Sequence, residues 1–318
     1  MARILLVKTS SLGDVVHNLP VVSDVLAHMP GASIDWVVEQ SFSAIPQLHA
    51  GVAQVIPVAI RRWRRSPLSG QTRGECCNFL QRIRHQAYDA IIDTQGLLKS
   101  ALVTCVARGV KHGLDWKSSR EPLRLFYDRT YAVPWGQHAV TRNRSLAAQA
   151  LGYAVISPAD YGIGCPTKGF PWLPGGRYAV LLHATSADAK LWSESLWAEL
   201  SKYLFLNNIV CVLPWGNAVE RDRSERLAAA MQQAIVPPAL ALHDAARLIA
   251  GAHTVVGVDT GLTHLAAALG VPTVGVYGAT DPAATGIHAG PHAVNLGGIG
   301  APPSVQDVIA ALERLMPV

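Results

Sequence analysis

The stretch ARILLVKTSSLGDVVHNLPVV, residues 2–22, contains the structural unit from which the fold is predicted. Leu5, Leu6 and Val7 form an apolar run typical of a buried strand, and residues 18–29 have the pattern of a helix. A short polar turn, residues 9–14, joins the two. A strand that leads through a turn into a helix is the repeating unit of parallel α/β sheets, so this stretch predicts an α/β protein.

One residue of that turn, Asp14, is a carboxylate where small residues alone would close the turn. One interpretation is that Asp14 caps the helix that follows. The other is that it carries out chemistry, because parallel sheets bind ligands at the carboxyl ends of their strands, in the loops that lead to helices. The turn by itself does not choose between them.

Short β-branched runs alternate with helical patterns along most of the chain, which predicts two parallel sheets covered by helices. The predicted strands are residues 3–8, 33–39, 55–59, 90–94, 178–183, 209–213, 254–258 and 273–277. The Pro- and Gly-rich segment GCPTKGFPWLPGG, residues 164–176, is typical of a linker. We therefore predict two Rossmann-like domains, residues 1–166 and 167–318, with their ligand loops facing a shared cleft. We expect the last helix, residues 304–316, to pack back on either domain, the N-terminal one included.

Composition favours a globular protein. The 318 residues are too many for one compact core, half of them are hydrophobic and 15% are charged. The chain start lacks the pattern of a secretory signal, and polar residues interrupt the longest apolar stretch. Five cysteines without metal-ligand or disulfide spacing fit a reducing compartment, so we expect a cytoplasmic protein.

The net charge of +5 is unevenly distributed. Residues 1–166 hold 18 Lys and Arg against 11 Asp and Glu, whereas residues 167–318 hold 9 against 11. The excess is sharpest over residues 61–144, with 16 basic and 6 acidic residues. The first half is therefore predicted to face an anionic partner.

The clearest site motif is VVGVDTGLTHLAAALGVPTVGVYGATDP, residues 255–282, in which a strand leads into Asp259, Thr260 and Gly261 and then a helix. The free N–H groups at that helix start favour phosphate, and Asp259 is suited to bonding a ribose or sugar hydroxyl. His264 lies one turn further on. The alternative is an ordinary helix-capping Asp with a satisfied core His.

Two more loops have similar chemistry. LLHATSADAKLW, residues 181–192, ends a strand in Thr185 and Ser186, and Lys190 follows as a point charge suited to a diphosphate. VLPWGNAVERDRSERL, residues 212–227, places Glu220 in a first helical turn. The alternatives are a solvated lysine and an acid that interacts with the helix dipole. Together the three loops suggest a nucleotide-sugar pocket. Dinucleotide and P-loop glycine motifs are absent from the sequence.

The other signal is AIRRWRRSP, residues 59–67, with Arg61, Arg62, Arg64 and Arg65 around Trp63. Further basic residues follow on later predicted loops, namely Lys99, Lys111, Arg120, Arg142 and Arg144. Arginine pairs bidentately with carboxylates and phosphates. Nucleic acid is the general interpretation of such a patch and a solvated charged face is the simplest one. The sequence has no known nucleic-acid module, so an anionic carbohydrate or lipid head group fits better.

These motifs carry a family resemblance. The chain resembles the ADP-heptose:lipopolysaccharide heptosyltransferases of glycosyltransferase family 9, over essentially its whole length and in the same motif order. The segments that carry it are VKTSSLGDVVHNLP, IPVAIRRWRR, GLLKSALVT, GVKHGLDW, SREPL and VDTGLTHLAAAL. The arginine run around Trp63 is the most specific of them and points to members that add the first heptose of the inner core.

The resemblance implies a GT-B fold and inverting, metal-independent transfer of L-glycero-D-manno-heptose from ADP-heptose to the Kdo of Kdo2-lipid A, with no cofactor. It implies that Asp14 is the general base and that Lys190 assists departure of the diphosphate. The implied donor-binding residues are Thr185, Ser186, Lys190, Glu220, Leu240, Asp259, Thr260, Gly261 and His264. The implied acceptor-binding residues are Ser10, Arg61, Arg62, Arg64, Arg120 and Arg142. Leu240 replaces a methionine of a relative, and Ser186 replaces a threonine.

The expected location is the cytoplasmic face of the inner membrane, with peripheral contact to its surface and no nucleic acid as partner. Alternatives are a related transferase that adds the second heptose, a nucleotide-sugar epimerase, and a non-catalytic basic binding protein on the same fold. The arginine run disfavours both other enzymes. Asp14 and Lys190, which an idle protein could lose, are both present.

Overall fold

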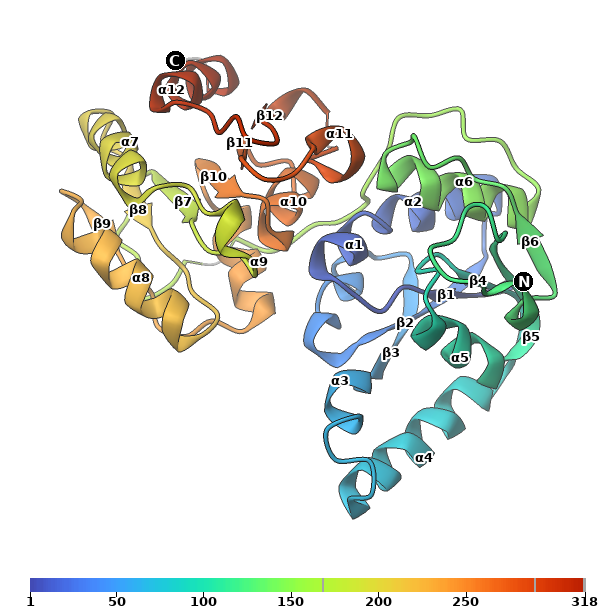
Figure 1. Cartoon of the computed structure of the whole chain (residues 1–318). Coiled ribbons are helices and arrows are strands. Elements are labelled where there is room, and N and C mark those ends of the chain that lie inside the picture. Colours follow the sequence, from blue (N-terminus) through green and yellow to red (C-terminus); the bar gives the residue numbers. More distant parts are fainter. Residues whose placement is uncertain (168, 289, 317–318) are drawn as a thin grey trace. The chain divides into compact units, whose positions relative to one another are not determined.

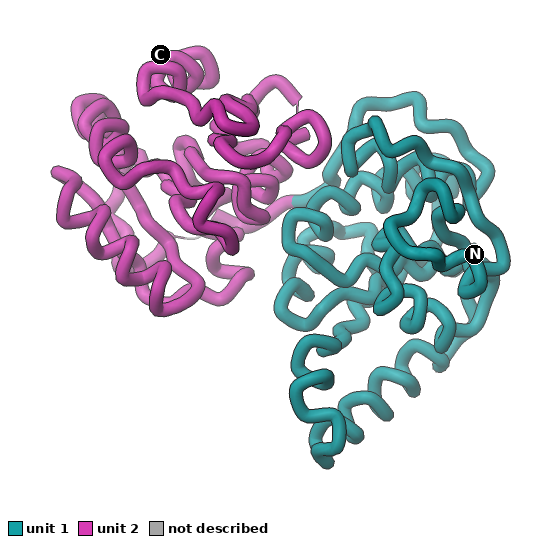
Figure 2. The backbone as a smooth tube through the Cα atoms, viewed as in Figure 1, with its two compact units in different colours: residues 1–163 teal, residues 164–318 magenta. Residues whose placement is uncertain are grey.

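The computed structural model describes residues 1–167, 169–288 and 290–316. The chain divides into two units, Met1–Ile163 and Gly164–Val318 (Figure 2). The predicted boundary between residues 166 and 167 lies a few positions later. Residue 168 of the predicted linker, and residues 289 and 317–318 of the predicted second domain, lie outside the described residues.

Unit 1 is built on a six-stranded parallel sheet with the order β3-β2-β1-β4-β5-β6. The strands are β1 (Arg3–Val7), β2 (Ser33–Glu39), β3 (Val52–Val58), β4 (Ala87–Asp93), β5 (Arg108–Leu114) and β6 (Arg129–Tyr131). The α-helices are α1 (Leu12–Val16), α2 (Leu19–His28), α3 (Ile60–Trp63), α4 (Gly70–Arg84), α5 (Leu98–Val106) and α6 (Ala139–Leu151). Short 3₁₀ turns are η1 (Gln40–Phe42), η2 (Pro46–Leu48) and η3 (Arg124–Phe126).

Alternation along the strands of unit 1 divides its core into two layers. Leu5 and Val7 of β1 pack with Phe79 of α4 and Val103 of α5 in one apolar cluster. Helices α2 and α6 pack on each other on the other face of the sheet (Figure 1). A sheet covered on both faces requires apolar strands throughout, which is why β1 is almost entirely buried.

Unit 2 repeats the plan with the order β12-β11-β10-β7-β8-β9, again all parallel. The strands are β7 (Tyr178–Leu182), β8 (Val210–Val212), β9 (Ala234–Ile235), β10 (Thr254–Val258), β11 (Thr273–Tyr277) and β12 (Ala293–Gly297). The helices are α7 (Glu194–Leu206), α8 (Ala218–Ala229), α9 (Leu242–Ala250), α10 (Gly261–Ala268), α11 (Pro282–Thr285) and α12 (Val305–Leu315), with 3₁₀ turns η4 (Asp188–Lys190) and η5 (Gly290–His292).

Both sheets have the same order when their strands are counted along the chain, the doubly wound order in which the chain reverses direction across the sheet at a central pair of strands. That pair is β1 and β4 in unit 1, and β10 and β7 in unit 2. Ligands of such sheets bind outside the carboxyl ends of this pair. The predicted α/β class with two parallel sheets is confirmed.

Several details differ from the prediction. Strands β5, β6, β9 and β12 were not predicted, because polar residues or short length hide their pattern. Asp14 lies inside helix α1, which begins at Leu12, and not in an open turn. The last helix, α12, packs on α7, β11 and β12 of unit 2 through an apolar face that includes Val308 and Leu312, which is one of the two options that the sequence left open.

Within the described ranges, no helix is both long enough and apolar enough to cross a membrane.

Candidate active site

Asp14 lies in the first turn of α1, just beyond β1. Its Oδ2 atom accepts hydrogen bonds from the backbone N–H of Ser11 at 2.6 Å and from the Ser11 hydroxyl at 2.9 Å. These bonds close the helix start, as one of the two sequence interpretations predicted. The other oxygen, Oδ1, accepts no hydrogen bond from the described residues, and the side chain is half-buried. Capping therefore uses one oxygen and leaves the other for a ligand.

The loop after β4 fixes the turn that leads to Asp14. Gln95 Oε1 accepts hydrogen bonds from the backbone N–H groups of Thr9 at 3.1 Å and Ser10 at 3.0 Å. Asp93, at the end of β4, accepts the backbone N–H of Gln95 at 2.9 Å. Burial raises the pKa of Asp93, and the hydrogen bonds that it accepts oppose that shift. The two central strands of the sheet thus hold the turn between them.

Two lysines lie close to Asp14. Lys8, buried after the end of β1, donates from Nζ to the carbonyl oxygen of Thr94 at 2.8 Å. Lys99, in the first turn of α5, donates to the hydroxyl of Ser10, a predicted acceptor contact. Burial lowers the pKa of both lysines, and the negative charge of Asp14 opposes that shift in each case. Two lysine side chains therefore lie close enough to the carboxylate to interact with its charge.

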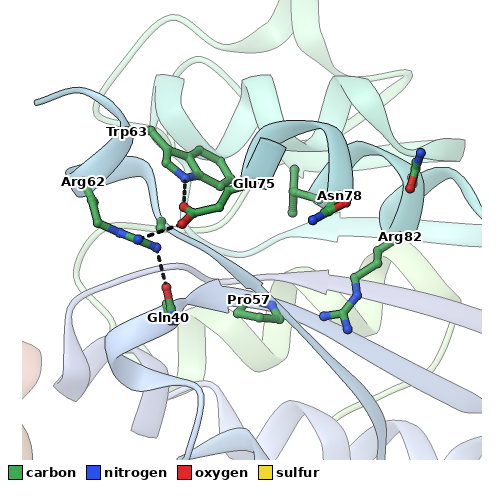
Figure 3. A pocket seen from close by; sticks show the side chains of 10 residues that line it. Gln40, Pro57, Arg62, Trp63, Glu75, Asn78 and Arg82 are labelled. Carbon is green, nitrogen blue, oxygen red and sulfur yellow. Dashed lines mark hydrogen bonds and ion pairs between the residues drawn. The ribbon is translucent and has the colours of Figure 1, made fainter. Parts of the chain in front are cut away.

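Arg62 of the arginine run is held within unit 1. Its guanidinium donates to Glu75 at 2.8 Å and to Gln40 at 2.8 Å (Figure 3). The indole N–H of Trp63 donates to the other oxygen of Glu75 at 2.7 Å. These groups line a polar pocket of about 540 Å³ together with Arg82. The predicted role of Arg62 in acceptor binding would require it to give up these partners or share them.

Arg61 and Arg64 are exposed, and neither forms an ion pair with any residue in the described part of the chain. The Arg61 guanidinium lies 5.9 Å from the centre of the Phe42 ring. Its positive charge also lowers the pKa of Lys99, after the larger effect of burial. Arg65, the remaining member of the run, is likewise exposed, so these three side chains are the ones available to an anion.

Arg120 and Arg142 lie on the same side of unit 1 as Lys8. Arg142 donates to the carbonyl oxygen of Ser118 at 2.7 Å and stacks over Trp135, with 4.0 Å from its guanidinium carbon to the ring centre. Arg120 is exposed. Burial lowers the pKa of Lys8 most, and the charges of Arg142 and Arg120 add to that shift. Of the predicted acceptor residues, Arg142 and Arg120 thus lie close enough to Lys8, at the start of the Asp14 turn, for their charges to act on it.

Two basic residues of the sequence signal have internal partners. Arg144 lies in helix α6 rather than on a loop. Its guanidinium donates hydrogen bonds to both carboxylate oxygens of the buried Asp24, at 2.7 and 2.8 Å. Lys111 lies in β5, 3.7 Å from Asp128. Each of these pairs uses one base and one acid, so fewer basic residues of the first half are unpaired than the residue count suggests, while the excess of bases over acids stays the same.

In unit 2, the carboxylate of Asp259 is the centre of the site at the end of β10. Its Oδ2 accepts from Lys190 Nζ at 2.7 Å and from the Thr280 hydroxyl at 2.8 Å, and His264 Nε2 lies 3.5 Å from Oδ1. Burial by itself would raise the pKa of Asp259, but the hydrogen bonds from His264, Lys190 and Thr280 outweigh it and hold that pKa far below its usual value. Asp259 is thus an anion that holds Lys190 in place.

The predicted donor loops meet at the β7 and β10 strand ends. The hydroxyl of Thr185, from the loop after β7, donates to the carbonyl oxygen of Asp259 at 3.1 Å, and Ser186 beside it is exposed. Thr260 is the N-cap residue of α10, which begins at Gly261, but its side chain makes no capping hydrogen bond. The first N–H groups of α10 thus lack a side-chain cap, as a phosphate site requires.

Glu220 and Leu240 have structural partners. Glu220 accepts the backbone N–H of Gly216 and the side-chain amide of Asn217, each at 2.8 Å. It therefore closes the start of α8, as the alternative interpretation predicted. Leu240 is partly buried against the apolar core of unit 2. Neither contact tests the binding roles that the family resemblance implies for these two residues.

Four residues of these sites were not assigned a role from the sequence: Lys8, Gln95, Lys99 and Thr280. Lys8, Gln95 and Thr280 all lie just after a strand, so the rule that identified Asp14 and Asp259 would also have found them. Lys99 belongs to the basic signal, but its contact with Ser10 spans 89 positions of the chain. Such a long-range contact leaves no local pattern.

Comparison with known proteins places this geometry in a family. Residues 76–308 match the family described as glycosyltransferase family 9 (heptosyltransferase). Lipopolysaccharide heptosyltransferase 1 of Pseudomonas aeruginosa is 49% identical over 298 residues, which cover 93% of this chain and 83% of that relative. The structure of Escherichia coli heptosyltransferase WaaC with ADP matches with a TM-score of 0.91 and 44% identity, covering 98% of this chain and 99% of that one. WaaC with ADP-2-deoxy-2-fluoro heptose matches with a TM-score of 0.86 and 43% identity, at the same coverage.

The similarity extends over almost the whole chain, includes both units and confirms the GT-B fold that the motifs implied. It also confirms the enzyme class, since the relatives are lipopolysaccharide heptosyltransferases and the matched family is a glycosyltransferase family. The chain belongs to glycosyltransferase family 9 and is an enzyme of the heptosyltransferase 1 type.

Proposed function

We propose that this enzyme transfers L-glycero-D-manno-heptose from ADP-heptose to the Kdo of Kdo2-lipid A, with inversion at the sugar carbon and without a metal ion. The product carries the first heptose of the lipopolysaccharide inner core. The transfer reaction takes place at the cytoplasmic face of the inner membrane. Support comes from the similarity to heptosyltransferase 1 and to a structure that holds an ADP-heptose analogue.

The observation that carries the proposal is the cation held at the β7 and β10 strand ends. Lys190, 2.7 Å from Asp259, and the side-chain-uncapped start of α10 form a place for a diphosphate. The hydroxyls of Thr185 and Ser186 are further donors. As the bond between heptose and ADP breaks, negative charge accumulates on the diphosphate, and these groups would stabilise it where a metal ion does so in other enzymes.

Asp14 is proposed as the general base. The acceptor hydroxyl of Kdo attacks the anomeric carbon from the face opposite ADP, its oxygen forms the new glycosidic bond, and its proton passes to Asp14. The free oxygen Oδ1 suits this role, because Oδ2 is occupied by Ser11 and fixes the carboxylate in place. The electron pair of the broken bond leaves with ADP.

The acceptor carries carboxylates on its Kdo sugars, so its binding calls for cations near Asp14. Lys99 already contacts Ser10, and Arg61, Arg64 and Arg120 are exposed. Arginine forks bind carboxylates bidentately, which would orient the sugar as well as hold it. Asp14 would then receive a proton from a hydroxyl that is already positioned.

The test is ADP release from ADP-heptose, with and without Kdo2-lipid A, by the purified enzyme and by Asp14→Asn. Asparagine keeps an oxygen that can accept from Ser11 but is a far weaker base. We expect the variant to melt within a degree or two of the wild type and to bind ADP-heptose normally. Its turnover should fall by roughly 10²- to 10⁴-fold.

Ser11→Ala is the matched control, since it removes the hydroxyl that caps α1 with Asp14 but leaves the carboxylate. We expect it to retain most of the turnover. An Asp14→Asn enzyme that turns over at nearly the wild-type rate would restrict Asp14 to capping. Release that needs an acceptor already carrying one heptose would assign the second transfer instead.

A further inference from the structure

An open groove of about 770 Å³ lies in unit 1 between helices α3, α4 and α5 and above β3. Its floor is Val58 and Phe79, which belong to the apolar core of the unit. Its walls include Trp63 of α3 and Leu80 of α4. The volume is typical of a small-molecule site, and neither capping nor the proposed chemistry accounts for it.

The lip of the groove on α5 is apolar and open to solvent. Leu98 and Leu102 line it, and they are 48% and 53% exposed. Single exposed leucines are ordinary on protein surfaces. Here, however, the exposed leucines continue into a concave apolar surface that includes Val106 and Leu80, and such surfaces mark binding sites for apolar groups.

Trp63 lines both the polar pocket and the apolar groove. Its indole N–H is bonded to Glu75 in the polar pocket, and the same side chain also lines the apolar groove. The ring packs 5.9 Å from Phe79, measured between centres. Glu75 therefore fixes the orientation of a wall of the groove without placing a charge inside it.

The charged residues at the groove determine which apolar molecules suit it. Lys99 and Arg64 line its rim. Lys99 also binds Ser10, and Asp14 and Arg61 lie close enough to shift its pKa, which burial lowers most. The groove thus begins where the proposed acceptor site lies. The groove lining also includes the acid Glu121, which accepts the backbone N–H of Leu98 and lies close enough to Lys99 to act on its pKa, so two cations share the lining with one carboxylate.

We propose that this groove binds one acyl chain of an anionic lipid while Lys99 and Arg64 hold the charged head group. The inference rests on the proposed function, because it takes the acceptor to be a lipid. Apolar lining with a net positive charge, from Lys99 and Arg64 against Glu121, fits an amphiphile with a negative head better than a flat protein surface or a neutral ligand. Unit 1 thereby selects the acceptor by its chain as well as by its sugar.

The binding test uses octyl, decyl and dodecyl phosphate below their micelle-forming concentrations, measured by titration calorimetry with the full-length enzyme. Each added methylene should tighten binding to the wild type by about fourfold. Leu102→Gln removes an apolar contact without adding charge and keeps a good helix former. It should weaken dodecyl phosphate by about fivefold or more and flatten the dependence on chain length.

Leu206→Gln is the matched control, since Leu206 is also an exposed helix leucine, 79% exposed, but lies in unit 2. It should bind the series as the wild type does. Should Leu102→Gln melt early, Leu98→Gln takes its place at the same lip. Equal affinity for all three phosphates in the wild type, or unchanged binding by both lip variants, would overturn the proposal. So would Leu102-dependent binding of anionic vesicles without binding of single-chain phosphates, because the lip would then contact the bilayer.

Steady-state kinetics with two acceptors distinguishes a failure of this inference from a failure of the proposed function. With Kdo2-lipid A, Leu102→Gln should lower kcat/KM by about the same factor as it weakens dodecyl phosphate. With the fully deacylated acceptor it should match the wild type. Equal loss on both acceptors counts against the groove, even if transfer itself is confirmed. If no acceptor is used at all, the proposed function fails, and the alkyl phosphate series still decides whether the groove takes a chain.

Discussion

Replacing Lys190 by Met removes the cation of the donor site and keeps most of the apolar stem. A charge-assisted hydrogen bond contributes about 1.5–3 kcal/mol. The lower part of that range applies, because the Lys190 side chain is 28% exposed and shares its charge with Asp259 at 2.7 Å. Losing about 1.5–2 kcal/mol should weaken ADP binding by roughly 10- to 30-fold.

The variant should also acquire a pH dependence. In the wild type, burial would raise the pKa of Asp259, but its hydrogen bonds hold it far below the usual value, so Asp259 remains charged from pH 8 to pH 5. Without Lys190 the burial effect is less opposed and the pKa rises. As pH falls, Asp259 then takes up a proton and repels the diphosphate less. Binding of ADP to the variant should tighten toward pH 5 relative to the wild type.

Titration calorimetry with ADP at pH 8, 6.5 and 5 measures both effects, and the wild type at each pH corrects for protonation of ADP itself. Lys190→Arg should bind within a few-fold of the wild type, since it keeps the charge. Lys202→Met, which removes an exposed lysine of α7, should have no effect. A Lys190→Met enzyme that binds ADP within threefold of the wild type, with the same pH profile, would refute the role assigned to this cation.

Two further outcomes follow from ion pairs of unit 1. Asp24→Asn leaves the buried guanidinium of Arg144 without its bidentate partner, so urea unfolding should show a free energy of unfolding lower by about 3–5 kcal/mol. An unchanged affinity for ADP would show that the role of the pair is structural. A decrease in the free energy of unfolding of less than about 1 kcal/mol would contradict the reasoning. Arg61→Ala should raise the KM for the lipid acceptor more than Arg62→Ala does, because Arg62 is held by Glu75 and Gln40. The reverse order in steady-state kinetics would place Arg62 in the acceptor site.

The parts of the fold that could be predicted are those fixed by local pattern. The strands β2, β10 and β11 have the predicted bounds, because they are rich in β-branched residues and turns follow them. Strand β5 escaped prediction because its first residues, which include Arg108 and Lys111, alternate between exposed and half-buried positions near the edge of the sheet. These polar, partly exposed residues make the start of β5 resemble a loop in sequence, although β5 pairs with strands on both sides.

The site shows the same division. Asp14 and Asp259 follow central strands, so their positions could be predicted from the order of elements. Whether a basic residue is free or paired could not, because the partner is distant in the sequence: Arg144 lies 120 positions from Asp24, and Lys190 lies 69 from Asp259. Sequence pattern thus finds the places where chemistry can occur, and long-range contacts decide which side chains remain available there.

Net charge is a poor guide to where the anionic donor binds. The unit proposed to hold the diphosphate corresponds to the half of the chain with more acids than bases, and its key cation is already neutralised by Asp259. A lysine whose charge is shared with Asp259 suits a diphosphate that has to leave after the reaction. A cluster of unpaired cations would bind the ADP product as firmly as the transition state, whereas one shared lysine and a helix start stabilise the charge as it forms and then release it. Arg61, Arg64 and Arg120, which form no ion pair with the described residues, lie instead in the unit proposed to hold the acceptor, where several carboxylates have to be oriented before the proton can move.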